Sequence, residues 1–374
     1  MILKKDKVFT FWIILLFAYL FIKMQEQIGN AVISLYAQNL FLTVLYILGI
    51  VCLLIFKKNK INKTTAYAII FTLFSLCSSL FFSKLTFYTI INQTFWLLVL
   101  LISCNISNKD EQNKISTILM IAFIINVLFI LINSKHLILS QINSIYYIVL
   151  LFPVLFLFKN KYFRIVLTLI TFYLVIISTK RVAFLVILSI SILPVAFTYK
   201  YLNNFKKVRA ILLVFIIIVI ALFSYNEILE YLKNVNIWNR LTMLSEDGGS
   251  GRMDIYKSVI LGIKNSNFIN ICFGHGFLGV YVNNISTTSA HNDFLEIMYD
   301  YGIFGLISYI VFIINWFKNF YLNAKGSIIS NKMFISSLII FIFMSTFSHL
   351  IIYPTYYFYL IIIISLFNNK KVEK

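Results

Sequence analysis

Charged residues, glycine, proline and cysteine are all scarce in this chain of 374 residues. Only 12% of the residues are charged and 61% are hydrophobic, which excludes a soluble globular protein and a disordered tail. The 12 glycines and 3 prolines exclude collagen-like and low-complexity chains. Of the four cysteines only Cys272 falls in a predicted external loop, so no intramolecular disulfide is expected outside the membrane.

Long apolar runs are what the chain has instead. They are continuous, whereas strands of a membrane β-barrel alternate in polarity over about ten residues. The sequence therefore predicts an all-α, polytopic integral membrane protein with about 12 transmembrane helices. The predicted spans are residues 8–22, 35–56, 65–82, 85–106, 115–132, 142–158, 162–177, 182–199, 210–223, 298–317, 333–351 and 353–367.

The basic balance fits a membrane protein without any nucleic-acid partner. The net charge is +19, from 32 Lys and Arg residues against 13 Asp and Glu residues. With the N-terminus inside, 22 of the 32 cations fall in cytoplasmic segments and nine of the 13 acids fall outside. Both termini are therefore expected in the cytoplasm. The first helix lacks a small-residue cleavage site, so it is expected to remain in the protein.

One predicted loop is far longer than the others. It divides the chain into helices one to nine (1–223), an external loop (224–297) and helices ten to twelve (298–374). The loop holds helical patterns at 226–238 and from Arg252 onward, so we expect it to be folded and functional.

Two of the four histidines lie in this loop. His291 follows a polar stretch and precedes a predicted helix, where a neutral imidazole can accept a proton from a hydroxyl group. The alternative is a histidine that caps the helix start. His275 lies between two glycines and is expected to be structural, with a substrate-facing role as the alternative. His349 is expected to be a polar residue at a helix end or in the protein interior.

External cations are few and therefore informative. Arg252 opens a loop helix, and a guanidinium at a helix N-terminus suits a phosphate or diphosphate. Lys180 and Arg181 form an external turn that can hold a lipid diphosphate or snorkel to headgroups, and Arg181 is the better candidate for a specific role. For Arg252 the alternative is a salt bridge to one of three nearby acids, Glu246, Asp247 or Asp254.

Several motifs of soluble and metal-dependent enzymes are missing from the sequence. It has no D-x-D motif, P-loop, zinc-spaced Cys/His cluster or G-x-S-x-G elbow, so neither a metal nor another cofactor is expected. Asp and Glu are nearly absent from the span centres, which argues against an ion-coupled transporter.

Short motifs between Ser178 and Leu306 occur in a recognisable order. Ser178–Leu185 reads STKRVAFL, and Gly251–Ser258 reads GRMDIYKS. F-G-x-G, H-N-x-F-L-E and G-x-x-G-L then follow from positions 273, 291 and 302. Together with the topology, they resemble the O-antigen ligase and O-antigen polymerase (Wzy-type) superfamily, although Lys180 stands where that family more often has Ser or Gly.

The resemblance implies a GT-C-like membrane protein with glycosyltransferase activity in the bacterial cytoplasmic (inner) membrane. Such enzymes join glycans carried on undecaprenyl diphosphate at the external face, with inversion and without a metal. By resemblance, the catalytic residues are His291 as the base, with Arg252 and Arg181 stabilising the leaving diphosphate. The resemblance places the remaining candidates in substrate binding: Lys180, Asn292, Glu296, His275 and Tyr256.

Three functions remain open from the sequence. A polymerase of O-antigen or capsule repeats is favoured, with a second lipid-linked repeat as acceptor. A ligase that transfers the glycan to lipid A-core has the same features. A flippase or transporter is less favoured because the chain shows no internal repeat and little intramembrane charge. The expected partners are the undecaprenyl diphosphate-linked oligosaccharide, membrane lipids and a polysaccharide chain-length regulator.

Overall fold

The described part of the chain is entirely helical. A computed structural model describes residues 5–26, 34–55, 62–83, 86–105, 109–133, 143–199, 251–325, 327–351 and 353–366, and these ranges contain no strand. Their elements are α1 (Lys5–Glu26), α2 (Leu35–Ile55), α3 (Lys63–Phe82), α4 (Phe87–Cys104), α5 (Lys109–Ile132), α7 (Ile145–Leu151), the 3₁₀ helix η1 (Phe152–Leu157), α8 (Lys161–Ile177), α9 (Arg181–Tyr199), α13 (Arg252–Lys264), α14 (Phe268–Phe273), α15 (Gly279–Val282), α16 (Asp293–Ala324), α17 (Ile328–Phe347) and α18 (Pro354–Ser365).

Seven described helices are long and apolar enough to cross a membrane, namely α1 to α5, α16 and α17. Shorter apolar helices lie at Ile145–Leu157, Arg181–Ile192 and Thr355–Ser365, within the predicted sixth, eighth and twelfth spans. Helix α8 forms at the predicted seventh span with 17 residues. The predicted ninth span and the predicted loop helix at 226–238 lie outside the described residues. The polytopic all-α class is thus confirmed, and the total of twelve spans stays a prediction.

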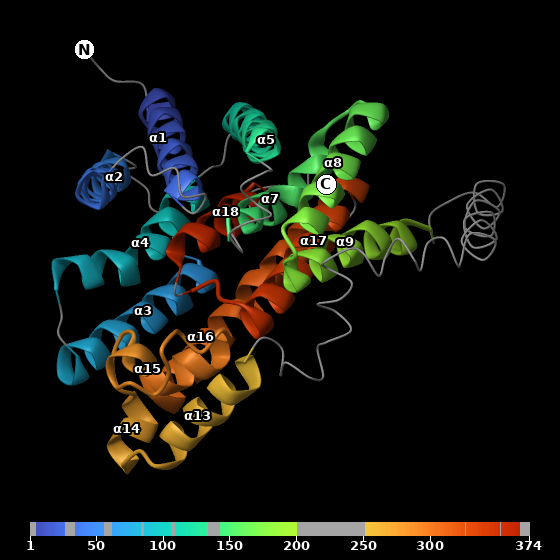
Figure 1. Cartoon of the computed structure of the whole chain (residues 1–374). Coiled ribbons are helices and arrows are strands. Elements are labelled where there is room, and N and C mark those ends of the chain that lie inside the picture. The colour runs from blue at the N-terminus through green and yellow to red at the C-terminus, as the bar shows by residue number, and fades with distance from the viewer. Residues whose placement is uncertain are drawn as a thin grey trace, which may run out of the picture.

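The helices near the long loop form a packed group around α16. Helix α3 packs along α16, while α13 and α14 pack against the first part of α16 and α17 against its side. Helix α18 packs against both α4 and α7 (Figure 1). Aromatic rings fill the interior of this group, as where Trp96 of α4 contacts Phe312 of α16 and Tyr357 of α18. Helices from the N-terminal and the C-terminal parts of the sequence therefore share one core.

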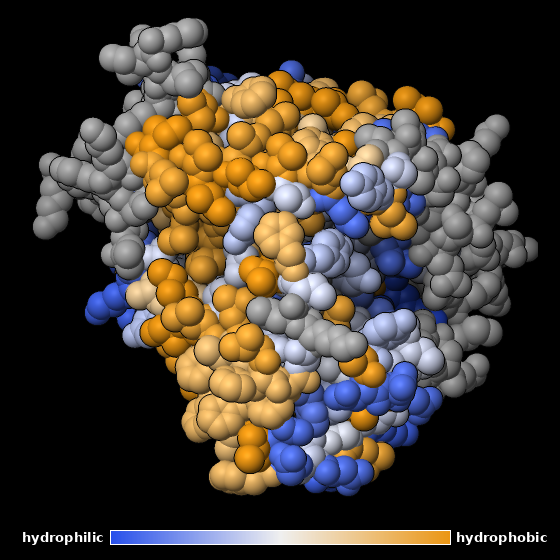
Figure 2. Space-filling model, turned by 90° about the vertical axis from the view of Figure 1, so that its left-hand side faces the viewer, coloured by the Kyte–Doolittle hydropathy of each residue, from blue (hydrophilic) through white to orange (hydrophobic). Residues whose placement is uncertain are grey.

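The helices α13 to α15 gather at one end of the bundle (Figure 1). Contacts there show which helix ends face this side: Ser83, just after α3, lies against Gly276, and Arg252 of α13 reaches Phe347 at the end of α17. On the face shown in Figure 2, hydrophobic residues cover most of the described surface, and hydrophilic ones gather strongly at the lower end, at the height of α13. The ends of α3 and α17 and the start of α16 therefore share one side, as expected for alternating membrane crossings.

Helix α16 is interrupted at Gly302, and the glycine-rich segment 273–279 fits into the break. Gly302 has φ +67°, and a Cβ there would lie 2.4 Å from the carbonyl carbon of Cys272. Gly274 has φ +83°, and a Cβ there would lie 2.2 Å from the carbonyl oxygen of Asp300. This close approach of two backbones requires glycine on both sides. The motifs F-G-x-G and G-x-x-G-L are thus two halves of one contact.

The break frees a carbonyl that other groups satisfy. The carbonyl oxygen of Asp300 accepts hydrogen bonds from Gly276 N at 2.8 Å and from Ser78 Oγ of α3 at 2.9 Å. The Asp300 carboxylate, also buried, accepts from Leu278 N at 2.9 Å. Because buried polar groups are costly when unpaired, these bonds fix the glycine-rich segment against α3 and α16. These hydrogen bonds therefore hold the glycine-rich segment in place beside the start of α16.

Candidate functional site

His291 lies at the start of α16 in a left-handed backbone conformation, with φ +51°. Its neighbours hold this conformation from two sides. Tyr256 of α13 donates its hydroxyl toward the His291 carbonyl oxygen, at 3.2 Å, and Glu296 accepts a hydrogen bond from the amide of Ala290. A non-glycine residue at positive φ persists only where its surroundings enforce it, so the imidazole position is strongly specified.

The next two residues tie α16 to the turn between α17 and α18. Asn292 caps α16 by accepting from Phe294 N at 3.0 Å, and its amide donates to the Thr346 carbonyl at 3.1 Å. Asp293 is fully buried, and its carboxylate accepts from Leu350 N at 3.0 Å. The N-cap therefore also sets the position of the segment that carries His349.

His291, His349 and Tyr353 form a continuous stack of rings. The centroids of the two imidazoles are 4.9 Å apart, and those of His349 and Tyr353 are 4.5 Å apart. The hydroxyl of Ser289 lies 3.4 Å from Nδ1 of His349. Two histidines that are far apart in the sequence thus lie side by side, and the stack leads from the loop to the start of α18.

Both imidazoles are held in the neutral form. Burial, followed by the charges of Arg252 and Lys180, lowers the pKa of His291 to about 4. Burial, His291 and the same two cations lower the pKa of His349 to about 3. Within the described residues, Nδ1 of His291 is buried and has no hydrogen-bond partner. Near neutral pH, His291 is therefore an uncharged proton acceptor beside two fixed cations.

The two cations reach this place from different elements. Arg252 is the first residue of α13 and donates a hydrogen bond to the carbonyl oxygen of Phe347, in the last turn of α17. Of the acids expected near it, Asp254 pairs instead with Lys257 at 3.7 Å, and Glu246 and Asp247 lie outside the described residues. Carbonyl groups at a helix C-terminus attract cations, which explains why the guanidinium is held there.

The turn before α9 supplies the other cation. Lys180 directly precedes Arg181, the first residue of α9, and the cation of this turn that lowers both histidine pKa values is Lys180. The structure thus brings Lys180 and Arg252 near His291, and Arg181 follows Lys180 in the sequence. Arg181 was the better candidate on sequence grounds, and its role stays a prediction.

His275 has a different environment. Its Nε2 lies 2.8 Å from the Ser266 hydroxyl, its Nδ1 lies 3.3 Å from the Asn270 amide nitrogen, and its ring stacks on Tyr299 at 4.3 Å. The Ser266 hydroxyl donates to the Gly262 carbonyl, so Nε2 carries the proton and Nδ1 accepts. Burial lowers the pKa of His275 as well. Both ring nitrogens are used inside the protein, which agrees with a structural role.

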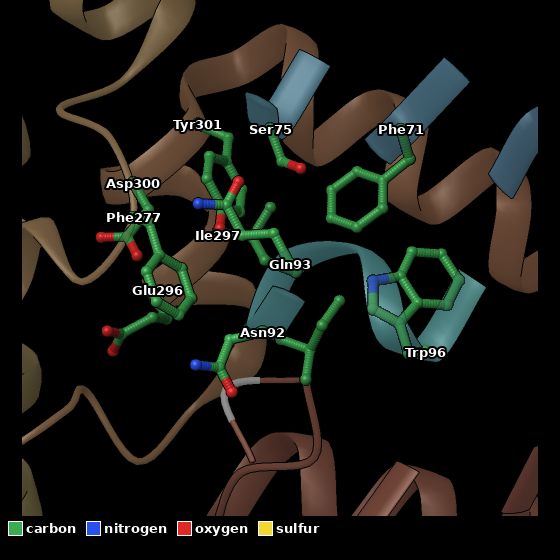
Figure 3. A pocket seen from close by; sticks show the side chains of 11 residues that line it. Phe71, Ser75, Asn92, Gln93, Trp96, Phe277, Glu296, Ile297, Asp300 and Tyr301 are labelled. Carbon is green, nitrogen blue, oxygen red and sulfur yellow. The ribbon is translucent and has the colours of Figure 1, made fainter. Parts of the chain in front are cut away.

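Glu296 connects the His291 segment to a small cavity in the bundle (Figure 3). One carboxylate oxygen accepts from Ala290, and the other, Oε1, is buried without a hydrogen-bond partner in the described structure. The cavity has a volume of about 20 Å³, enough for one water molecule. Its polar lining, besides Glu296, is formed by Ser75, Asn92, Gln93 and Asp300.

The sequence reasoning did not identify two members of this site. His349 was expected only as a helix-end or interior polar residue, and it is indeed buried. Asp293 was counted only as an external acid. The available signal was the pair of histidines at the two predicted span ends, since both ends face the same side. Among the described residues, no group of three or more His, Cys, Asp or Glu side chains is arranged to hold a metal ion.

Comparison with known proteins bears on the segment that carries these residues. No curated protein matches the chain. A family model described as O-antigen ligase matches residues 165–310, which include Lys180, Arg181, Arg252, Tyr256 and the whole segment from His275 to Glu296. This segment is thus similar to the O-antigen ligase family, whose members are glycosyltransferase-type enzymes, and the match supports the resemblance to the O-antigen ligase and polymerase superfamily.

Proposed function

We propose that the protein polymerises lipid-linked oligosaccharide repeats of O-antigen or capsule. The donor is a glycan on undecaprenyl diphosphate, and the acceptor is a hydroxyl group of a second lipid-linked repeat. The hydroxyl oxygen attacks the anomeric carbon, the bond from that carbon to the phosphate oxygen breaks, and the hydroxyl proton passes to His291. Inversion follows because the acceptor attacks opposite the departing diphosphate. The site faces the outside of the bacterial inner membrane, with both termini in the cytoplasm.

One observation carries this proposal: the neutral imidazole of His291 stands beside two fixed cations. A histidine that removes a hydroxyl proton must itself be unprotonated, and His291 meets this condition near neutral pH. The leaving diphosphate gains charge as the bond breaks, and Arg252 and Lys180, with Arg181 beside them, can stabilise it electrostatically. No metal or other cofactor is invoked.

Donor binding would also strengthen the base. A pKa of about 4 makes a free His291 a weak proton acceptor, and part of that lowering comes from Arg252 and Lys180. A bound diphosphate neutralises these cations, so the pKa of His291 rises toward its ordinary value when the donor is in place. Proton removal from the acceptor is thereby coupled to occupancy by the donor.

The other candidate substrate residues have clear supporting positions. Tyr256, Asn292 and Glu296 each bind the backbone around His291 or the adjoining end of α17. We assign all three to positioning the base. His275 braces the glycine-rich segment. A chain-length regulator remains a proposed partner.

Glycan display tests the proposal. A strain lacking the gene is complemented with wild-type protein, His291→Ala or His275→Asn, and each protein is quantified in membranes. A polymerase gives a ladder with wild type, and a single repeat attached to core in the deletion strain and with His291→Ala. Loss of all attached glycan in the deletion strain, with long polymer still on the carrier lipid, would instead indicate a ligase. Full rescue by His291→Ala would refute the assigned base.

A further inference from the structure

A second and much larger cavity lies at the Tyr353 end of the ring stack. Its volume is about 530 Å³, within the range of about 300–1,000 Å³ typical of small-molecule sites. It is formed by the C-terminal part of α1, by α2, by the start of α4, by α7, by the glycine-rich segment and by the start of α18. Its lining includes four tyrosines, Tyr19, Tyr88, Tyr147 and Tyr353.

The lining chemistry selects a neutral, hydroxyl-rich ligand. Tyrosine rings offer flat faces together with hydroxyl groups, and Asn92 and Thr355 add further hydrogen-bonding groups. Lys23 is the one cation in the described lining and is paired with Glu26 at 2.9 Å, so this part of the lining offers no free positive charge of the kind that holds a diphosphate. Asn92 already donates to the Tyr88 carbonyl, and Tyr147 donates to Thr355. A lipid tail would offer no hydrogen-bonding partner to the hydroxyl groups of the other three tyrosines, which is unfavourable. Sugar rings fit both the flat faces and the hydrogen-bonding groups.

The cavity is connected to the proposed base along two routes. Tyr353 lines the cavity and stacks on His349, which stacks on His291. Asn92 and Phe277 line both this cavity and the small one that contains Glu296 (Figure 3). Arg252 and Lys180 lower the pKa of both histidines, whereas the charge that acts on Tyr353 is that of Glu296.

From this arrangement we infer that the tyrosine-lined cavity binds the sugars of the acceptor. In an inverting transfer, the acceptor must approach from the side opposite the leaving diphosphate, and the cations hold that diphosphate. The claim that the bound sugars belong to the acceptor rests on the proposed function. The binding of a neutral oligosaccharide in this cavity is a separate claim and can be tested without any catalysis.

Equilibrium dialysis of the purified full-length protein provides the test. The probe is the tritiated oligosaccharide repeat of the host's own surface polysaccharide, released from its carrier by mild acid. Tyr88→Ala and Asn92→Ala change the lining, and Tyr36→Ala is the matched control, because Tyr36 is 80% exposed on α2 and outside the cavity. Tyr88 is itself 49% exposed, so its replacement is compatible with folding.

We expect Tyr88→Ala and Asn92→Ala each to raise the Kd about 5–10-fold, the loss of one hydrogen bond or ring contact, and Tyr36→Ala to leave it unchanged. His291→Ala should bind the repeat normally, which separates this inference from the proposed reaction. No binding by the wild-type protein, or equal Kd values for all three tyrosine and asparagine variants, would overturn it. Normal binding by His291→Ala without transfer by the wild type would refute only the polymerase assignment.

Discussion

The segments around His275 and His291 are similar in their surroundings, but they differ in whether the ring nitrogens of the histidine have hydrogen-bond partners. Each histidine lies in an irregular segment next to α16, each is partly buried, and each stacks on another ring. His275 has both ring nitrogens engaged by Ser266 and Asn270. Nδ1 of His291 is buried without a partner among the described residues, beside Lys180 and Arg252. The first histidine completes a structure, and the second is kept available.

This difference shows where the protein carries unfavourable energy. An unpaired buried nitrogen costs roughly 1–3 kcal/mol, and a positive φ at a non-glycine residue adds to that. Both costs fall on His291, and the hydrogen bonds of Tyr256 and Glu296 hold the residue in place despite them. Strain and an unused polar atom at the same residue are typical of a functional group.

Replacing each of the two histidines by glutamine gives the largest expected effects. His291→Gln removes the proton acceptor, so kcat should fall by about 10²–10⁴-fold with little change in thermal stability. His275→Gln breaks a buried hydrogen-bond pair and a ring stack, so Tm should fall by several degrees while kcat per folded molecule is kept. Transfer assays with purified protein and thermal unfolding in detergent measure the two effects. A large loss of kcat in well-folded His275→Gln would contradict the assignment of a purely structural role to His275.

Much of the fold could be predicted because its determinants are local. Apolar runs predicted the spans that α1 to α5, α16 and α17 now occupy. The boundary set at residue 298 was less accurate, since α16 begins at Asp293. The five residues before 298 include Asp293 and Glu296, whose buried carboxylates bond to backbone amides. Hydropathy counts such carboxylates as polar loop residues and cannot register that partners bury them.

The residues of the candidate site could be predicted where they belong to a short sequence motif, but not where they come together only through tertiary packing. His291, Arg252 and Lys180 came from short patterns, and the structure brings them together. The stack of His291 on His349 joins residues separated by all of α16 and all of α17, so no local pattern could indicate it. The tyrosine-lined cavity likewise draws on α1, α4, α7 and α18, and only the tertiary fold assembles it.

Removing a cation tests whether the charge beside His291 is what separates it from His275. Arg252 lowers the pKa of His291, so Arg252→Gln should raise that pKa above about 4 and move the acid limb of the rate profile to higher pH. Lost stabilisation of the diphosphate should also lower kcat by about 10²–10³-fold. Transfer rates measured across the acid range give both effects.

Lys257→Gln is the matched control for Arg252→Gln. Lys257 lies on the same helix, is 70% exposed and pairs with Asp254, so its removal should leave the acid limb and kcat unchanged. An equal shift in both variants would mean that the general charge of α13, and not the place of Arg252, sets the pKa of His291.

The smallest expected effect concerns His349, which has no counterpart beside His275. Its pKa is about 3 in the folded protein and near 6.5 in an unfolded chain, so between these values the unfolded state binds the extra proton. His349 therefore contributes stability that is fully present above about pH 6.5 and is lost as the pH falls toward 3. His349→Phe keeps a ring between His291 and Tyr353 but cannot be protonated. The fall in Tm between pH 7.5 and pH 5.0 should be about 2–4 °C smaller in this variant than in the wild type, measured by thermal unfolding in detergent. An equal fall in Tm in both proteins would show that the fold does not keep His349 neutral. The contact with His349 would then not help to explain how the environment of His291 differs from that of His275.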